Sequence, residues 1–532
     1  MRNIAYLLLV ISFFPFVGNA QVATGQWTWM KGDNVINQTA IYGTQGIAST
    51  ANKPGARQSA ATWTDASGKF WLFGGLGYDA ASGPYYLNDL WEYDPSLNQW
   101  TWVKGDNVTG QYGIYGTQGT SNIANKPGSR EGSIIWVENG NLWLFGGTGL
   151  GQSGSAGRLN DLWKYNIATN IWTWMKGDNV VNLGGVYGAP GIAAIVNKPG
   201  GRLFASSWTD NNGGMWLFGG NGYDANNASG QLADLWKYDT LLNEWTWMKG
   251  NKTINALAVY GAQGVPAPAN NPGARDGGVS WRDNAGTFWL FGGSGYDASS
   301  TGFLNDLWKY DINSNQWTWM KGDNVVGQFG IYGTPGTEAS SNKPGGRNVS
   351  AGWLDLFGNL WLFGGSGLAT SGGQGYLNDV WKYNTSSNDW TWIAGNSTID
   401  NGGVYGTQGT PAAGNRPGSS QGSSSWIDNK GSLWLFGGFG KDASTTTGYL
   451  NNLWVYGTGG FVWTGLESSD WNVATNWSGN TVPGIANQVI IPTSTPFSLI
   501  IPAGTSVSCK DISVLSGATV TIQGNGNLNV SH

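Results

Sequence analysis

The sequence is poor in the residues that most often carry out chemistry. Among 532 residues there is one cysteine, Cys509, and one histidine, the terminal His532. A single cysteine excludes an intramolecular disulfide, so the fold has to be held together by its core. Without a positioned histidine, neither a Ser-His nor a Cys-His catalytic pair can form, which excludes hydrolases of those two types. For Cys509, a buried inert side chain and a disulfide to another chain are both open.

Charged residues are also scarce. They make up 11% of the chain, against about 25% in a typical soluble domain. The formal net charge is −5, and this weakly acidic balance argues against nucleic acid or anionic lipid as a partner. No apolar run approaches the roughly 18 residues that a spanning helix needs, so we expect no membrane insertion.

The first 20 residues have the pattern of a secretory signal peptide. Arg2 supplies the positive charge, Ile4 to Val17 form an apolar stretch, and Gly18-Asn19-Ala20 give a small-x-small cleavage pattern. This pattern predicts a signal peptide over 1–20 and a protein that is secreted or held at the cell surface.

Glycine (87 residues) and aromatic residues (14%) are abundant. They belong to a unit of 72 or 73 residues that occurs six times, in which a PG dipeptide precedes FGG, a segment like LNDLWKYD, and WTW. A fixed period with turn residues between aromatic runs is typical of propellers and solenoids. The chain is therefore expected to be all-β. The repeated prolines are Pro54, Pro127, Pro199, Pro272, Pro344 and Pro417.

One copy of the repeat predicts four short strands. In the fourth copy they are expected near 278–281, 288–291, 304–311 and 316–320, and Asp283 to Gly286 suit a type I turn between the first two. Four strands joined by hairpins make one blade of a β-propeller.

The repeats resemble kelch repeats, as in the central propeller domain of galactose oxidases. A diglycine follows the second strand in all six copies, and a tyrosine precedes a tryptophan by seven residues, as Tyr310 precedes Trp317. The resemblance covers about 27–460 and implies a kelch-type propeller of a secreted bacterial type. A kelch blade has about 50 residues; here each blade carries an additional insertion, such as the 24 residues from Val103 to Lys126.

The order of the strands predicts how the ring closes. The WTW strand first occurs at Trp27, before any complete blade, and the last set of three strands ends at Tyr456 with no WTW after it. We therefore expect Trp27-Thr28-Trp29 to complete the sixth blade. The prediction for 21–460 is a six-bladed kelch-type β-propeller with N-terminal strand closure.

The remaining residues, 461–532, predict a small C-terminal β module. Leu499 to Val530 alternate apolar and polar residues between glycine turns, which is typical of β structure and favours the rungs of a parallel solenoid. The chain stops abruptly at His532, so a truncated gene product is one interpretation of this module.

The chemistry of galactose oxidases is not expected in this chain. That family depends on two histidine ligands, two tyrosines, and a cysteine cross-linked to one of them. Here His532 and Cys509 both lie outside the propeller, so neither the copper site nor the cross-link can be built in the ring. No cofactor is predicted.

Carboxylates are the remaining candidates for catalysis, since Asp and Glu total 32. Most of them recur in register, as turn-forming residues do, and we expect those to be structural. Aspartates also recur in the loops after the diglycine, but no loop has a calcium-binding pattern, and no metal site is predicted. The recurrent acids are, in the first hairpin, Asp65, Asp210, Asp283, Asp355 and Asp428, and in the loops, Asp79, Asp224, Asp297 and Asp442.

Two repeated sets of side chains are the candidate binding residues. An arginine opens the first strand of five blades, where it could ring an anion in the central channel or bond carbonyls of the blades; Ser420 replaces it in the sixth. A tyrosine recurs in each long insertion, as part of a binding face or as a loop anchor. The sets are Arg57, Arg130, Arg202, Arg275 and Arg347, and Tyr42, Tyr115, Tyr187, Tyr260, Tyr332 and Tyr405.

The long connections after FGG and after WTW share one face of a propeller, and long loops on a rigid scaffold are where propellers place function. The resulting hypothesis is an exported, monomeric, non-catalytic scaffold that binds protein or glycan through this face. The alternative is a carbohydrate-active enzyme that uses carboxylates in the central funnel. A cluster of two or three acids confined to particular blades at the funnel mouth would favour the enzyme.

Overall fold

The computed structural model describes residues 25–478, 481–485, 487–493, 495–515 and 517–531. The predicted signal peptide lies outside them. In the part of the chain that is described, one short 3₁₀ helix (Ala474–Asn476) accompanies 41 β-strands. The prediction of an all-β chain is confirmed.

Each of the six repeats forms a four-stranded antiparallel sheet. A two-residue strand after the PG dipeptide extends the first strand of each sheet toward the long loops. In the second and third repeats the second strand is interrupted at the diglycine and resumes after it. The strands of the first three repeats are β2 (Arg57–Gln58), β3 (Ala61–Thr64), β4 (Phe70–Gly77), β5 (Tyr85–Asp94) and β6 (Gln99–Lys104); β7 (Arg130–Glu131), β8 (Ile134–Glu138), β9 (Asn141–Phe145), β10 (Thr148–Gly149), β11 (Gly157–Arg158), β12 (Leu162–Asn166) and β13 (Ile171–Lys176); and β14 (Arg202–Leu203), β15 (Ser206–Thr209), β16 (Met215–Phe218), β17 (Asn221–Tyr223), β18 (Ser229–Gln231), β19 (Asp234–Asp239) and β20 (Glu244–Gly250).

The last three repeats follow the same order. Their strands are β21 (Arg275–Asp276), β22 (Val279–Arg282), β23 (Phe288–Tyr296), β24 (Thr301–Asp311) and β25 (Gln316–Lys321); β26 (Arg347–Asn348), β27 (Ala351–Leu354), β28 (Leu360–Gly367), β29 (Gly375–Asn384) and β30 (Asp389–Ala394); and β31 (Ser420–Gln421), β32 (Ser424–Ile427), β33 (Leu433–Lys441) and β34 (Thr447–Tyr456), with β1 (Trp27–Lys31).

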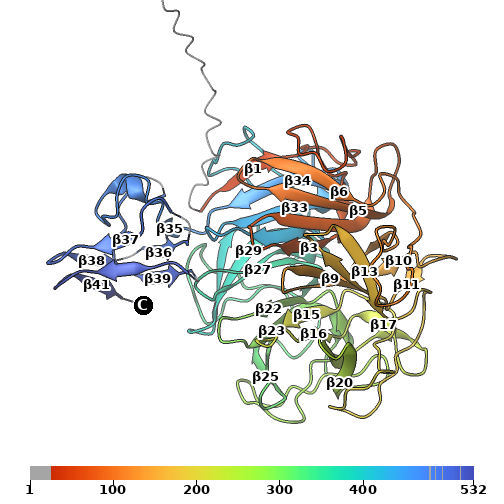
Figure 1. The fold of residues 1–532 in the computed structure, drawn as a ribbon. Helices are drawn as coiled ribbons and strands as arrows, with labels where there is room; N and C mark the ends of the chain where they lie inside the picture. The colour runs from red at the N-terminus through yellow and green to blue at the C-terminus, as the bar shows by residue number, and fades with distance from the viewer. Residues whose placement is uncertain (1–24, 479–480, 486, 494, 516, 532) are drawn as a thin grey trace, which may run out of the picture.

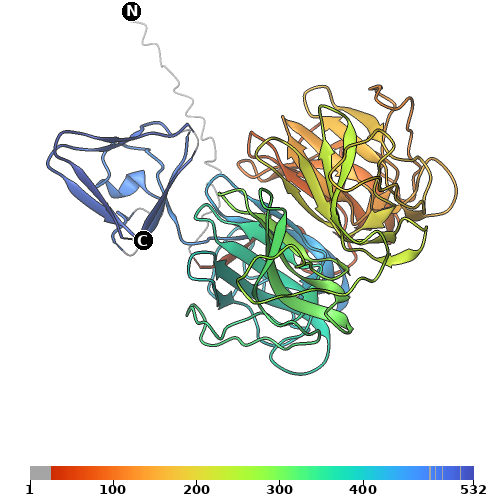
Figure 2. The ribbon, with the colours of Figure 1, turned by 90° about the horizontal axis from the view of Figure 1, so that it is seen from below.

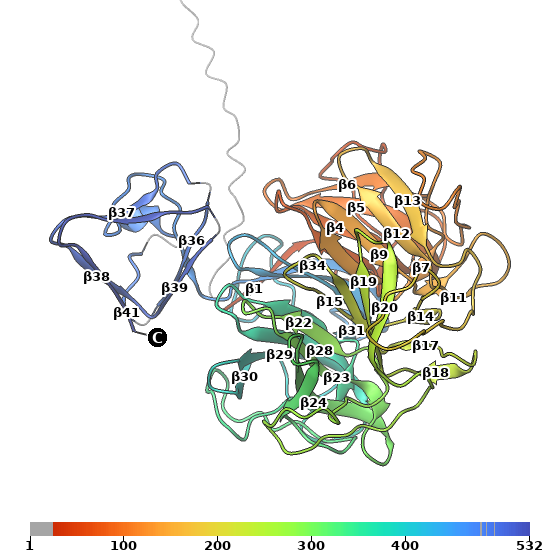
Figure 3. The same cartoon turned by 60° about the horizontal axis from the view of Figure 1, so that its bottom comes forward.

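The sheets are arranged in a ring around a central axis (Figures 1 and 3). The inner strands β3, β8, β15, β22, β27 and β32 each contact the next, and β32 contacts β3. The diglycine allows this close approach. A Cβ on Gly74 (φ +65°) would lie 2.7 Å from the carbonyl oxygen of Arg130 in the next sheet, so no larger residue fits there.

The N-terminal strand closes the ring. β1 pairs antiparallel with β34, with Trp27 opposite Tyr456 and Trp29 opposite Trp454. The predicted closure is confirmed. It covers an edge of the last sheet that would otherwise leave its backbone groups unpaired.

Tryptophans join neighbouring sheets through both packing and hydrogen bonds. Trp63 Nε1 donates to the carbonyl of Trp136 at 3.1 Å, and across the closing seam Trp426 Nε1 donates to Trp71 O at 3.1 Å. The Trp426 ring also stacks on Phe70 at 5.4 Å. A buried tryptophan contributes on the order of several kcal/mol by area. Four of the five tryptophans in each repeat are thus buried, and the second tryptophan of WTW is half-buried in every copy except that of Trp247.

The C-terminal module is built from parallel strands, the solenoid-like arrangement that its sequence favoured. Three parallel sheets form its sides, giving the triangular outline in Figure 2. Inside it, the ring centroid of Trp477 lies 5.1 Å from that of Trp463 and 4.7 Å from that of Trp471, and Cys509 is buried there. The strands are β35 (Phe461–Val462), β36 (Gln488–Ile491), β37 (Leu499–Ile501), β38 (Ser506–Cys509), β39 (Asp511–Val514), β40 (Val520–Ile522) and β41 (Asn527–Val530).

The module touches the propeller at a short turn of the sixth sheet. A Cβ on Gly431 would lie 3.2 Å from Ile490 of β36 and 3.3 Å from Leu356. Gly431 and Leu356 belong to the turns between the first two strands of the last two sheets, on the face opposite the long loops. The long-loop face is therefore not covered by this contact.

Candidate functional site

The side chains of the five repeated arginines are buried, and each forms an ion pair with an aspartate of its own sheet. Arg57 donates to both carboxylate oxygens of Asp89, Nη1 to Oδ1 at 2.6 Å and Nη2 to Oδ2 at 2.8 Å, and its Nε donates to Gly55 O at 3.0 Å. Both side chains are fully buried. This places the guanidinium groups away from the channel, so they form no anion-binding ring there. The other pairs are Arg130–Asp161, Arg202–Asp234, Arg275–Asp306 and Arg347–Asp379.

The repeated tyrosines meet the same aspartates. Tyr42 donates its hydroxyl to Asp89 Oδ2 at 2.8 Å. Burial, followed by the charge of Asp89, raises the pKa of Tyr42, so the phenol stays protonated and keeps donating. Five of the six tyrosines thus tie a long insertion to the Arg–Asp pair of their sheet, which is the loop-anchor interpretation. All six, namely Tyr42, Tyr115, Tyr187, Tyr260, Tyr332 and Tyr405, are buried.

The sixth sheet lacks this ion pair on both sides. Ser420 stands where the arginine would be, and Asn452 stands where the aspartate would be and donates to the hydroxyl of Tyr405. Because both charges are absent together, no buried charge is left unpaired. The change at Ser420 is therefore matched by the change at Asn452 in the same sheet.

The recurrent acids are structural, as predicted. In the first hairpin, Asp65 Oδ1 accepts the N–H groups of Ser67 at 2.8 Å and Lys69 at 3.1 Å, while Oδ2 accepts Trp71 Nε1 at 2.8 Å. In the loop after the diglycine, Asp79 accepts backbone N–H groups, including that of Thr109 at 2.8 Å. Among the described residues, no group of three or more His, Cys, Asp or Glu is placed to hold a metal ion.

A closed ring of backbone hydrogen bonds links the six sheets around the central axis. Six residues, one from each sheet, have φ between 52° and 64°, and each donates its N–H to the carbonyl of the equivalent residue in the preceding sheet at 2.7–2.9 Å. We call this the axial ring. It brings the six backbones together at the axis, where the chain lines a small hollow of about 150 Å³. The six residues are Ser59, Gly132, Phe204, Gly277, Val349 and Gly422.

Next to the axial ring, each sheet presents a row of three directly paired residues, one from each of its inner strands. We call the six rows together the funnel. Neighbouring rows contact one another: Gln58 Nε2 donates to Glu131 Oε2 at 3.2 Å, and Gln231 Nε2 donates to Asp276 Oδ2 at 2.9 Å. The rows are Gln58–Leu76–Tyr86, Glu131–Thr148–Arg158, Leu203–Asn221–Gln231, Asp276–Ser294–Phe303, Asn348–Ser366–Tyr376 and Gln421–Phe439–Tyr449.

One side of the funnel is aromatic. The ring centroid of Phe439 lies 4.8 Å from that of Tyr449 and 5.9 Å from that of Tyr376. The ring centroids of Tyr449 and Tyr78 are 6.0 Å apart. These rings come from the fifth, sixth and first sheets. The rows of the second, third and fourth sheets carry mostly polar and charged side chains, so the funnel has two chemically different sides.

Two carboxyl groups, Glu131 and Asp276, are the acids of the funnel rows. Burial raises the pKa of Glu131 to about 7, against the opposing effect of the hydrogen bond from Gln58. Burial also raises the pKa of Asp276, while the amide donors of Gln231 and Asn221 and the charge of Arg158 act in the opposite direction. Each acid occurs on one sheet alone, Glu131 on the second and Asp276 on the fourth, so they meet only the sheet-specific part of the pattern named above as favouring an enzyme.

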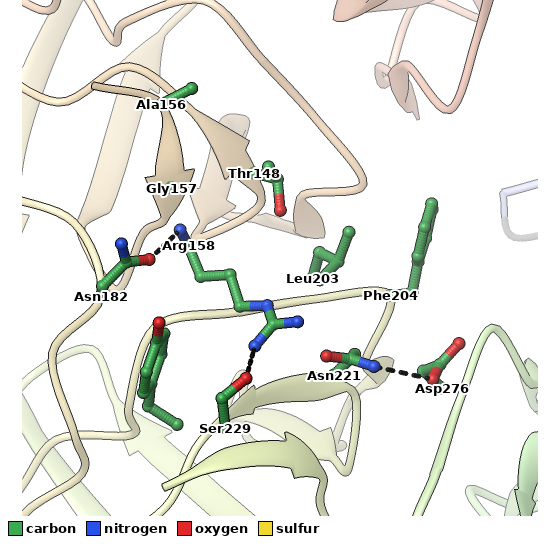
Figure 4. Close-up of a pocket in the computed structure, with 11 residues that line it drawn as sticks. Thr148, Ala156, Gly157, Arg158, Asn182, Leu203, Phe204, Asn221, Ser229 and Asp276 are labelled. Carbon is green, nitrogen blue, oxygen red and sulfur yellow. Dashed lines mark hydrogen bonds between the residues drawn. The ribbon is translucent and has the colours of Figure 1, made fainter. Parts of the chain in front are cut away.

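An open hollow of about 510 Å³ adjoins the polar side of the funnel. It lies between the second, third and fourth sheets, and Arg158 reaches into it (Figure 4). Arg158 donates to the Ser229 hydroxyl, and its own backbone N–H donates to Asn182 Oδ1 at 2.8 Å.

Two known proteins match part of the chain. Kelch domain-containing protein 10 of Bos taurus and that of Homo sapiens are each 23% identical to it over 235 residues. The match covers 36% of this chain and 48% of each relative, so the chain spans about half the length of the curated relatives it matches. The fold is a kelch-like β-propeller. Residues 462–532 match a domain of unknown function (DUF8693).

The residues of the funnel rows were not among the candidate residues predicted from the sequence. The signal was present: the residue after each repeated arginine differs in every copy except two, while the residues around it repeat. Those positions are Gln58, Glu131, Leu203, Asp276 and Asn348, with Gln421 following Ser420. The residues that recur in every repeat are structural, whereas the residues of the funnel rows are those that vary from repeat to repeat. Separately, no helix among the described residues is long and apolar enough to cross a membrane.

Proposed function

We propose that this protein is an exported, non-catalytic scaffold that binds a protein or glycan ligand in the funnel of its long-loop face. One observation carries the proposal: the funnel rows differ from sheet to sheet, whereas the residues that build the sheets repeat. A scaffold needs the repeated residues for folding, and a binding site needs the varied ones for specificity. The kelch homology supports a role in molecular interaction.

The composition of the funnel favours a glycan over a flat protein surface. Tyr376, Phe439 and Tyr449 offer apolar ring faces on one side. Amides and carboxyls on the other side can both donate to and accept from hydroxyl groups. A concave site with apolar walls and a few convergent polar groups is the usual form of a small-ligand site. The signal peptide predicted at 1–20 supports contact with extracellular ligands.

The test is a glycan array probed with the purified chain and with the double variant Tyr376→Ala/Tyr449→Ala. We expect a defined set of glycans to bind, and affinity to fall by about tenfold or more in the variant, because stacking faces are lost. Tyr112→Ala is the matched control, since Tyr112 is exposed and lies outside the funnel rows. An array without bound glycans, combined with no protein captured through the funnel, contradicts the proposal.

The second candidate is a carbohydrate-active enzyme in which Glu131 and Asp276 act as the acid and base. Their raised pKa values favour it, because a carboxyl that stays protonated near neutral pH can donate a proton. Release of reducing ends from a panel of polysaccharides, abolished in both Glu131→Gln and Asp276→Asn, would favour this enzyme. Binding without turnover would favour the scaffold.

A further inference from the structure

We propose that Arg158 binds the carboxylate of a uronic acid residue, so that the ligand of the funnel is an acidic saccharide. This inference rests on the proposed function, because it names the ligand class of the same site. It is carried by the position of Arg158, the contacts that hold it, and the groups around it.

Arg158 differs from the five buried arginines. Each of those uses its planar fork on an aspartate within its own sheet, as Arg57 does on Asp89. Arg158 has no carboxylate within 4.0 Å among the described residues. Its guanidinium group donates to one hydroxyl, that of Ser229. The side chain lines the open hollow, and a guanidinium fork matches a carboxylate in a bidentate geometry.

The side chain is held in position before any ligand arrives. Its guanidinium carbon lies 5.6 Å from the centroid of the Tyr223 ring, within reach of a cation–π interaction. Ser229 fixes one side of the fork, and Asn182 fixes the backbone of β11 at the base of the side chain (Figure 4). A positioned arginine loses less entropy on binding than a free one.

The other walls of the hollow suit a sugar ring. Thr148, Asn221 and Asp276 line it with hydroxyl, amide and carboxyl groups, which match the hydroxyls of a saccharide. A volume of about 510 Å³ is within the range of small-ligand pockets. The aromatic side of the funnel offers ring faces for neighbouring sugars of a chain.

The charge of Asp276 gives a second, independent prediction about the ligand. Asn221 Nδ2 and Gln231 Nε2 donate to it at 3.5 and 2.9 Å, and it lies across the hollow from Arg158, close enough for their charges to interact. An ionised Asp276 repels a ligand carboxylate, whereas it would assist a ligand that offers only hydroxyls. Removal of its charge therefore separates an acidic from a neutral ligand.

The experiment is calorimetric titration of the full purified chain with oligomers of galacturonate, glucuronate and mannuronate, each beside its methyl ester. The ester keeps the saccharide and removes the charge. We expect at least one acid form to bind about tenfold or more tightly than its ester, which corresponds to about 1.4 kcal/mol. Arg158→Gln should bring the two forms within about twofold, and Asp276→Asn should tighten the acid form alone.

Arg282→Gln is the matched control, because it removes the same charge from a half-buried arginine at the short-turn end of β22, outside the funnel rows. An ester that binds as well as its acid overturns the inference, as does an acid preference that survives in Arg158→Gln or is lost equally in Arg282→Gln. Binding of an acidic peptide in place of every uronate also overturns it. If neutral glycans bind through Tyr376 and Tyr449 while uronates do not, the inference fails and the proposed function stands; if nothing binds, both fail.

Discussion

At the scale of single residues, the sixth sheet shows how a buried ion pair can be replaced. Arg202 and Asp234 are both fully buried, so removal of one leaves the other unpaired. We expect Arg202→Ser alone to lower the free energy of unfolding by about 3–5 kcal/mol. The double variant Arg202→Ser/Asp234→Asn, which copies Ser420 and Asn452, should cost much less than the sum of its two single changes. Denaturant unfolding of the four proteins measures this coupling, and additive effects would contradict it.

Glu131 gives a prediction for pH. Its pKa rises from 4.5 to about 7 on folding because it is buried. The folded state therefore binds the proton more tightly than the unfolded state, so stability falls as pH rises through the window from about 4.5 to about 7. We expect the melting temperature to decline across this window and the decline to become shallower in Glu131→Gln. Scanning calorimetry at several pH values measures it, with Asp276→Asn as the comparison, since the pKa of Asp276 is raised too. An unchanged slope in Glu131→Gln would show that burial does not perturb this carboxyl.

At the scale of elements, closure by β1 is the contact that joins the most distant parts of the chain. Trp27 is buried against Phe363 and Tyr456. Deletion of 21–35 removes this strand and exposes an edge of β34, so we expect the melting temperature to fall by about 10 °C or more, with a greater tendency to aggregate. Deletion of 21–24 alone serves as the control, since β1 begins at Trp27. A transition unchanged in the longer deletion would refute the closure.

The strands could be predicted because their signals are local and repeated. FGG, WTW and the Asp-to-Gly turn each specify one element, and the missing final WTW predicted the pairing of β1 with β34. The axial ring could not be predicted in this way. Gly132 and Gly277 occur in it, but so does Val349 at φ +52°, a conformation that sequence alone does not suggest for a β-branched residue. The surrounding sheets impose it.

The candidate site was harder to predict for a related reason. Successive side chains of a strand point to opposite faces of the sheet. Arg57 and Gln58 are neighbours, yet Arg57 is buried in an ion pair while Gln58 belongs to the funnel. Arg57 could be chosen as a candidate from the sequence because it recurs in the repeats. Gln58 is identified only by the register in which the strands pair.

At the scale of the whole molecule, the two faces of the propeller have different roles in the proposed scaffold. The C-terminal module meets the short turns where Ile490 lies against Gly431, and the funnel opens on the other face. The module is therefore in a position to serve as a spacer while the funnel remains accessible.

This division predicts that ligand binding is independent of the module. A chain ending at Gly460 should bind a glycan identified on the array with a Kd within about twofold of the full chain, because no funnel row and no wall of the hollow comes from beyond Tyr449. Ile490→Asp in the full chain is the complementary variant: a charge placed against the turn at Gly431 should loosen the module, seen as a larger radius of gyration in solution scattering, with binding unchanged. A loss of affinity in both variants would mean that the module contributes to the site, and the ligand would then have to reach around the propeller to the face that carries the short turns.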